Sequence, residues 1–313
     1  MTALTTPDGT AASRFAFGTM QFGGNADEAD SRAMFDACRA VGINHFDTAT
    51  SYTGGRSEEI LGQLIKDERD SLLIATKVGY HGGANAENMQ KQFDASRSRL
   101  GLDVVDVLYL HRFDSDTPLE HTMEVFAGLK GSGAIRYIGL SNFAAWQVMK
   151  AQAIGPRVDI LQPMYNLVKR QVEVEILPMA ADQEITVAPY SPLGGGLLTG
   201  KYASGKTEGR LIENTYYNAR YGVDWMHDTA AELAQLGEEI GVSPATLAVA
   251  WVAAHPTGPV PIISARNLAQ LQPSLDAIAF DMNPALYDQI TGLSMQPPPA
   301  TDRIEEAVLG DMK

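Results

Sequence analysis

The sequence predicts an α/β fold, namely a single (β/α)8 TIM barrel over residues 1–313, with an N-terminal β-hairpin and extra helices near the C-terminus. Short apolar segments alternate with helical segments at regular spacing, which is typical of a parallel sheet covered by helices. Eight such units fit into 313 residues, a usual length for this barrel. Polar side chains also recur where the predicted strands end, and that end of a barrel carries the active site.

Pro7-Asp8-Gly9 indicates a turn, so residues 3–13 are expected to form a hairpin that closes the bottom of the barrel. The first barrel strand is predicted at 14–18. The other strands are centred near residues 45, 74, 107, 137, 160, 187 and 261.

Helices are expected between the strands, and two of them have clear start signals. Thr117, Pro118 and Glu120 predict a capping box. Asn283-Pro284 predicts the start of an extra helix over 285–293.

One connection is longer than the others, because residues 190–227 separate the strand at 186–189 from a helical stretch at 228–240. Three consecutive glycines at 194–196 allow a close backbone approach to phosphates, although a flexible linker is the alternative. The stretch 215–226 is rich in aromatic residues. We interpret it as a lid or a subunit contact, and a surface loop remains the alternative.

Composition excludes several classes of function. The formal charge of −14 argues against nonspecific binding to nucleic acid or to an anionic membrane. Cys38 is the single cysteine, so an internal disulfide cannot form. The first residues lack a signal-peptide pattern, and no apolar run is long enough to span a membrane, so we expect a cytoplasmic protein. The six histidines are scattered without an H-x-H pair, which argues against a metal site.

Four polar residues define the candidate catalytic site. Asp47 ends one predicted strand and Tyr52 follows it, Lys77 ends the next, and His111 ends the third. Asp47 alone could be a turn or cap carboxylate, and Tyr52 alone a surface phenol. If the strands are neighbours, however, all four converge on one face.

Together these groups can act as a general acid. An ammonium about 4 Å from a phenol contributes on the order of 4 kcal/mol, which would lower the phenol pKa from about 10. Asp47 would hold Lys77, and His111 could donate to an oxygen beside Tyr52. This arrangement suits protonation of a carbonyl oxygen as hydride reaches its carbon.

The chain resembles the aldo-keto reductases over residues 14–280. The resemblance is carried by FDTA (46–49) with Tyr52, SEEILG (57–62), ATK (75–77), LHRFD (110–114), IGLSNF (138–143), LQPMYNL (161–167) and YSPLGGGLLTGKY (190–202). It implies a nicotinamide cofactor bound on a barrel, which agrees with the absence of a G-x-G-x-x-G fingerprint.

Carried over by position, the resemblance assigns cofactor contacts along the chain. Ser141, Asn142 and Gln162 would hold the carboxamide, although helix caps and a strand-end polar group are the alternatives. Tyr190 would stack on the nicotinamide. Other contacts are assigned to Gly18, Thr19, Met20, Asp47, Ser191, Pro192, Leu193, Gly195, Leu197 and Lys201.

At the adenine end the sequence departs from the family. A common pattern places a basic residue and a serine after the last strand, then an arginine and an asparagine. This chain has Ser264, Ala265, Gln270 and Ser274 there, after Ile263. Arg266 is the remaining cation, which could bind a 2′-phosphate or stack on the adenine. NADP(H) is therefore favoured, and NAD(H) stays open.

The resemblance implies an NAD(P)(H)-dependent oxidoreductase that reduces aldehydes or ketones, or oxidises the matching alcohols or sugars. A regulatory subunit bound to a membrane channel is the alternative. The substrate, the direction of the reaction and any homo-oligomer are left open. The expected substrate contacts are Phe22, Tyr52, Tyr80, His81, His111, Arg112, Phe113 and Trp225.

Overall fold

The computed structural model describes residues 4–202 and 209–303. Eight parallel strands in these residues form one sheet in the order β7-β6-β5-β4-β3-β2-β1-β8. The strands are β1 (Ala16–Gly18), β2 (His45–Asp47), β3 (Leu73–Val78), β4 (Val105–Leu110), β5 (Ile135–Ser141), β6 (Ile160–Gln162), β7 (Thr186–Val187) and β8 (Ile262–Ile263). Each lies at or beside its predicted position.

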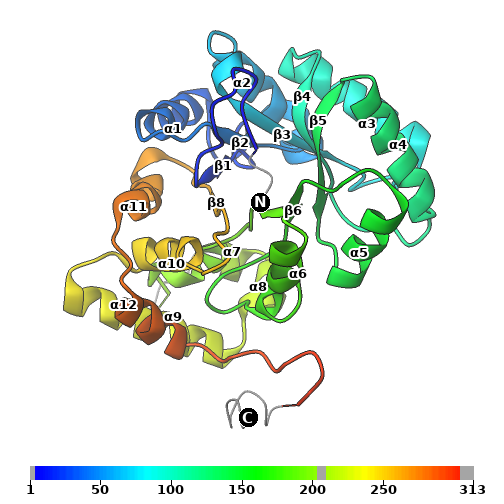
Figure 1. Ribbon diagram of the computed structural model, residues 1–313. Helices are drawn as coiled ribbons and strands as arrows, with labels where there is room; N and C mark the ends of the chain where they lie inside the picture. Colours follow the sequence, from blue (N-terminus) through cyan, green and yellow to red (C-terminus); the bar gives the residue numbers. More distant parts are fainter. Residues whose placement is uncertain (1–3, 203–208, 304–313) are drawn as a thin grey trace.

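The helices surround the strands (Figure 1). They are α1 (Glu28–Ala40), α2 (Arg56–Leu64), α3 (Ala86–Leu100), α4 (Leu119–Gly131), α5 (Ala145–Ile154), α6 (Ile176–Asp182), α7 (Arg210–Glu213), α8 (Thr215–Tyr221), α9 (Asp224–Ile240), α10 (Pro244–Ala253), α11 (Leu268–Ala279) and α12 (Pro284–Gly292). Short 3-10 turns are η1 (Tyr52–Gly55), η2 (Arg69–Ser71), η3 (Gln171–Glu173) and η4 (Gly194–Thr199).

The sheet curls so that its outermost strands approach each other. The backbone N–H of Val260 donates to Val187 O at 2.8 Å, and that of Ile262 donates to Pro189 O at 2.9 Å. Tyr190 and Ile262 also form a parallel bridge. The strands β7 and β8, together with the residues that follow β7 and precede β8, are therefore hydrogen-bonded neighbours although they are distant in sequence.

Side chains on the two faces of the sheet belong to two separate hydrophobic clusters. Leu73, Ala75, Val107 and Tyr109 lie in a small cluster inside the curl. Ile74 and the other residues of opposite parity belong to the large cluster between strands and helices. Successive strand residues point to opposite faces, which accounts for most of this division, although Val105 belongs to the large cluster despite sharing the parity of Val107.

The N-terminal segment packs against the start of β5. Thr5 and Ala11 form an antiparallel bridge, and Ala12 N donates to Leu4 O at 2.9 Å. Arg136 donates to Thr5 O at 2.6 Å. Residue 3, where the expected hairpin begins, lies outside the described residues.

The predicted extra helix is confirmed as α12, whose first turn is capped by Asn283 Oδ1 accepting from Leu286 N at 3.0 Å. The capping box predicted at Thr117 is wrong. Helix α4 starts after Pro118 without a side-chain cap, because the Thr117 hydroxyl donates to Asp114 Oδ2 at 2.7 Å instead. None of the described helices is long and apolar enough to cross a bilayer.

Candidate active site

Strand parity places three polar residues inside the curl of the sheet. Asp47 lies opposite Ala75, and Lys77 lies opposite Tyr109. His111 follows Tyr109 by two residues and so has the same parity. The three side chains emerge at the carboxyl ends of neighbouring strands β2, β3 and β4, above the apolar interior.

Lys77 is the centre of the group and is fully buried. Its Nζ donates to Asp47 Oδ1 at 2.5 Å, to Thr48 O at 2.6 Å and to Tyr52 Oη at 3.3 Å. Gln162 donates to the second oxygen of Asp47 at 2.9 Å. All three protons of the ammonium are thus used, which holds it in one place beside the phenol.

Desolvation works to lower the pKa of Lys77, but Asp47 and Tyr52 outweigh it, so the pKa of Lys77 is raised. Lys77 therefore remains a cation at neutral pH. The positive charge of Lys77 favours the ionised form of the neighbouring Tyr52 phenol and so works to lower its pKa.

Tyr52 is half-buried and opens the turn η1. The sequence predicted a lowered phenol pKa, and the net direction of that prediction is wrong. Burial raises the pKa of Tyr52, and this effect exceeds the lowering by Lys77. The estimate from a single charge pair omitted the cost of moving a phenolate out of water. Tyr52 is consequently a protonated donor at neutral pH.

His111 is a neutral imidazole. Burial, with the charges of Lys77, Arg112 and His81, lowers the pKa of His111 to about 3. Its Nδ1 is buried without a partner, so Nε2 is the nitrogen open to the pocket. The ring centroid lies 5.9 Å from that of Tyr52. A neutral imidazole with its proton on Nε2 can donate to an oxygen bound there.

Buried polar groups behind the site hold the loop that carries Tyr52. Glu58 accepts from Arg99 Nε at 2.7 Å and from Thr76 Oγ1 at 2.6 Å. Arg99 also donates to Thr50 Oγ1 at 2.6 Å, and Thr50 N donates to Lys77 O at 3.1 Å. The loop is therefore tied at Thr50 both to α3 and to the strand of Lys77.

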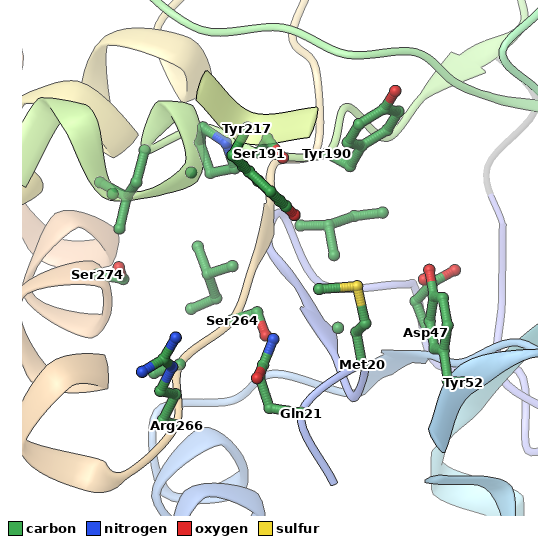
Figure 2. A pocket seen from close by; sticks show the side chains of 18 of the residues that line it. Met20, Gln21, Asp47, Tyr52, Tyr190, Ser191, Tyr217, Ser264, Arg266 and Ser274 are labelled. Carbon is green, nitrogen blue, oxygen red and sulfur yellow. The ribbon is translucent and has the colours of Figure 1, made fainter. Parts of the chain in front are cut away.

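A pocket of about 900 Å³ opens above these residues. Asp47 and Tyr52 lie at one end, and Arg266 and Ser274 lie at the other, with Met20 between them (Figure 2). The volume is in the range of sites for cofactors and drug-sized ligands. In the described part of the chain, no three His, Cys, Asp or Glu side chains gather as metal ligands.

Most of the predicted contacts line this pocket. They are Gly18, Met20, Asp47, Tyr52, Tyr80, His81, His111, Arg112, Ser141, Asn142, Gln162, Tyr190, Ser191, Pro192, Leu193, Gly195, Lys201, Ile263, Ser264, Arg266, Gln270 and Ser274. The pocket therefore joins residues from widely separated positions in the sequence.

Five predicted contacts do not line the pocket. Thr19 and Leu197 are buried beneath it. Phe22 is also buried, because its N–H donates to Thr19 O in a tight turn that packs its ring 5.7 Å from Phe17. Phe113 turns aside toward other aromatic rings. Trp225 packs against the hydrophobic core from α9.

Gly196, from the glycine run expected to approach phosphates, also lines the pocket. Sequence reasoning missed other lining residues, which are Gln21, Ser51, Thr199, Tyr217, Arg220, Ser243, Ala245, Ile262, Ala265 and Pro273. The signal for two of them was present. Tyr217 and Arg220 are three residues apart in the aromatic-rich stretch, and helical spacing places them on one face of α8.

The residues assigned to the carboxamide form a connected group at the ends of β5 and β6. Ser141 Oγ donates to Gln162 O at 2.9 Å, and Asn142 Nδ2 donates to His111 O at 2.9 Å. Tyr190 Oη donates to Asn142 Oδ1 at 2.7 Å. The helix-cap alternative does not apply, because the N-cap of α5 is Ala144.

At the opposite end, two hydroxyls lack partners. Ser264 Oγ and Ser274 Oγ are buried without a hydrogen bond, and both residues line the pocket. Arg266 lies between β8 and α11 in the same wall. Buried polar groups in proteins normally have hydrogen-bond partners. A polar or anionic ligand in the pocket could supply the partners that these groups lack.

The Aldo/keto reductase family model matches residues 14–294. The chain is 33% identical to the "Probable voltage-gated potassium channel subunit beta" of Arabidopsis thaliana, covering 96% of this chain and 94% of that protein. It is 33% identical to "Aldo-keto reductase YhdN" of Bacillus subtilis, with 88% of each covered. It is 27% identical to "Aldo-keto reductase yakc [NADP(+)]" of Schizosaccharomyces pombe, covering 86% of this chain and 83% of that protein.

Among solved structures, the glycerol dehydrogenase of Gluconobacter oxydans superimposes with a TM-score of 0.80 at 26% identity, covering 93% of this chain and 94% of that one. The chain belongs to the aldo/keto reductase family.

Proposed function

We propose that this protein is an NADP(H)-dependent oxidoreductase that reduces aldehydes and ketones, or oxidises the matching alcohols, with Tyr52 as the proton donor. The observation that carries the proposal is the buried Lys77 ammonium. It touches both Asp47 and Tyr52 beneath one end of the pocket.

Tyr52 holds the proton that the carbonyl oxygen receives. Its raised pKa keeps this proton in place until negative charge develops on that oxygen. Lys77 then stabilises the phenolate, because its Nζ is 3.3 Å from the phenol oxygen. Asp47 is a positioning residue that keeps Lys77 charged.

His111 orients the carbonyl. Nε2 is open to the pocket beside Tyr52, so both side chains can donate to one oxygen. Two donors aimed at the same oxygen stabilise the charge that grows there.

The pocket residues fit a dinucleotide. Lys201 and Arg266 supply positive charge, and the partnerless hydroxyls of Ser264 and Ser274 lie at the end away from Tyr52. A nicotinamide cofactor supplies the hydride or accepts it. Asn142, Gln162 and Tyr190 would hold its nicotinamide end, and Arg266 favours NADP(H) by pairing with a 2′-phosphate. A relative named with NADP(+) supports this preference.

The architecture that we propose is one closed barrel domain over residues 1–313, with the N-terminal turn covering its bottom. The hydrogen bonds from Val260 and Ile262 to the β7 segment support closure. The bridge between Thr5 and Ala11 supports the turn.

Turnover assays test the function. NADPH or NADH oxidation would be followed with a panel of aldehydes and ketones, with Tyr52→Phe as the matched variant that loses only the hydroxyl. We expect turnover by the wild type and a loss of about 10²–10⁴-fold in the variant. Cofactor binding without turnover of any carbonyl or alcohol would instead favour the channel-subunit role named for one relative.

A further inference from the structure

We infer that the substrate pocket selects carbonyl compounds that carry a carboxylate or similar anionic group, and that Arg112 binds this group. The inference rests on the proposed function. It goes further by assigning a charge to the substrate and one residue to its recognition.

The pocket has the opposite sign to the rest of the chain. The formal charge of the protein is −14. The charged residues in the pocket wall are Arg112, Lys201, Arg220 and Arg266, against a single carboxylate, Asp47, which is paired with Lys77. Lys201 and Arg266 are assigned to the anionic cofactor, so the cations of the wall left to attract an anionic substrate are Arg112 and Arg220.

Arg112 presents its donors without a protein partner. It is exposed at the pocket wall and forms no ion pair with the described residues, although its charge helps to lower the pKa of the nearby Asp114. The nearby Asp114 is occupied elsewhere, since its oxygens accept from Ala84 N at 2.8 Å and Asp116 N at 3.0 Å. A guanidinium with free donors matches the two oxygens of a carboxylate.

Tyr80 restricts where the guanidinium lies. The Cζ atom of Arg112 is 5.1 Å from the centroid of the Tyr80 ring, within the range of a cation–π contact. The same ring lies 4.8 Å from that of His111. Arg112 is thereby held beside the residue that orients the carbonyl.

The other cations are placed for the cofactor. Lys201 follows the glycine turn η4, and Arg266 lies at the end with the partnerless serines. The charge of Arg220 works to lower the pKa of Tyr190, the residue expected at the nicotinamide. Among the described cations of the wall, Arg112 alone directly follows His111 in the chain.

A pair of aldehydes of similar size tests the inference. 4-Formylbenzoate and its methyl ester differ by one charge, and the ester is intrinsically the more reactive aldehyde. A preference for the carboxylate therefore cannot come from carbonyl reactivity. We expect kcat/KM at saturating cofactor to favour the carboxylate by roughly tenfold. This is the lower end of the effect of a charge-assisted hydrogen bond, because the guanidinium of Arg112 is exposed to solvent. The aliphatic pair 4-oxobutanoate and its methyl ester provides a second chain geometry.

Arg112→Gln should remove this preference in both pairs, whatever its effect on the ester alone. Arg32→Gln is the control, because it removes the same charge from an exposed site on α1. Added salt should reduce the preference of the wild type. Equal kcat/KM for acid and ester overturns the inference while leaving the reductase intact. A preference that survives in Arg112→Gln overturns the assignment to Arg112. Absence of turnover with every charged and neutral carbonyl contradicts the proposed function itself.

Discussion

Replacing Lys77 by Met tests whether Lys77 and Tyr52 act as one unit. The two groups are 3.3 Å apart. At an effective dielectric of about 20, this separation corresponds to about 5 kcal/mol in favour of the phenolate. If about half of the negative charge has developed on Tyr52 in the transition state, the loss is about 2.5 kcal/mol, or roughly 10²-fold in rate.

Single-turnover hydride transfer, followed by nicotinamide absorbance, measures this loss without interference from product release. Tyr52→Phe should lose about 10²–10⁴-fold. The double variant should lose far less than the product of the two single losses, because either change disables the same proton donor. Losses that multiply would refute the coupling and show that the two residues act independently.

Stability must be separated from catalysis in this experiment. Lys77→Met leaves Asp47 buried without its counter-charge, which should lower the free energy of unfolding by about 3–5 kcal/mol. Adding Asp47→Asn removes the stranded charge. The variant that combines Lys77→Met with Asp47→Asn should regain stability but not the rate of hydride transfer, because the phenolate of Tyr52 still lacks its cation. A variant that regains both would show that Lys77 is needed only for folding.

Three further predictions address cofactor, pH and packing. Arg266→Ala should weaken NADP(H) binding by roughly 1.5–3 kcal/mol and leave the dissociation constant of NAD(H) nearly unchanged; equal losses would assign Arg266 to the adenine. Burial lowers the pKa of His45 to about 4. The unfolded chain, with a His pKa of about 6.5, therefore binds a proton that the folded chain does not, and stability falls as pH drops below 6.5. Urea unfolding measures the free energy of unfolding at each pH. Between pH 7.5 and 5 this free energy should decline by about 2 kcal/mol less in His45→Gln than in the wild type. The same pH dependence in both proteins would contradict a buried neutral ring. Arg99→Met should lower the free energy of unfolding by about 3–5 kcal/mol, because Glu58 is then buried without its ion-pair partner. The control Arg32→Gln, on the surface, should lower it by less than about 1 kcal/mol. Similar losses in the two variants would mean that the buried pair adds nothing to stability.

Strand periodicity made the catalytic end of the site predictable. In a parallel sheet every second residue faces the same side, and all strands end at the same edge. Lys77 and His111 follow apolar residues of the same parity, and Asp47 ends the neighbouring strand in register with Ala75, so their convergence needs only the strand order. That order was expected from the regular alternation of strands and helices.

Loop residues were predicted less well. Trp225 was expected in the pocket, but Tyr217 and Arg220 line it instead. Composition marked the right stretch, whereas the choice among its residues depends on where α8 ends and which face packs against η4. Phe22 lies outside the pocket for a related reason, since a tight turn at Thr19 reverses the chain and buries the ring.

The sequence by itself determined the α/β class of the fold and the carboxylate, phenol, ammonium and imidazole of the candidate site, because these follow from periodicity and from chemistry carried by single residues. Only the tertiary structure decided the protonation of Tyr52, whose pKa depends on the desolvation caused by every neighbouring group and not on Lys77 alone. It also decided which cations remain without a partner. Asp114, two residues from Arg112, accepts hydrogen bonds from the backbone N–H groups of Ala84 and Asp116 and forms none with the guanidinium of Arg112. The sequence alone does not show this.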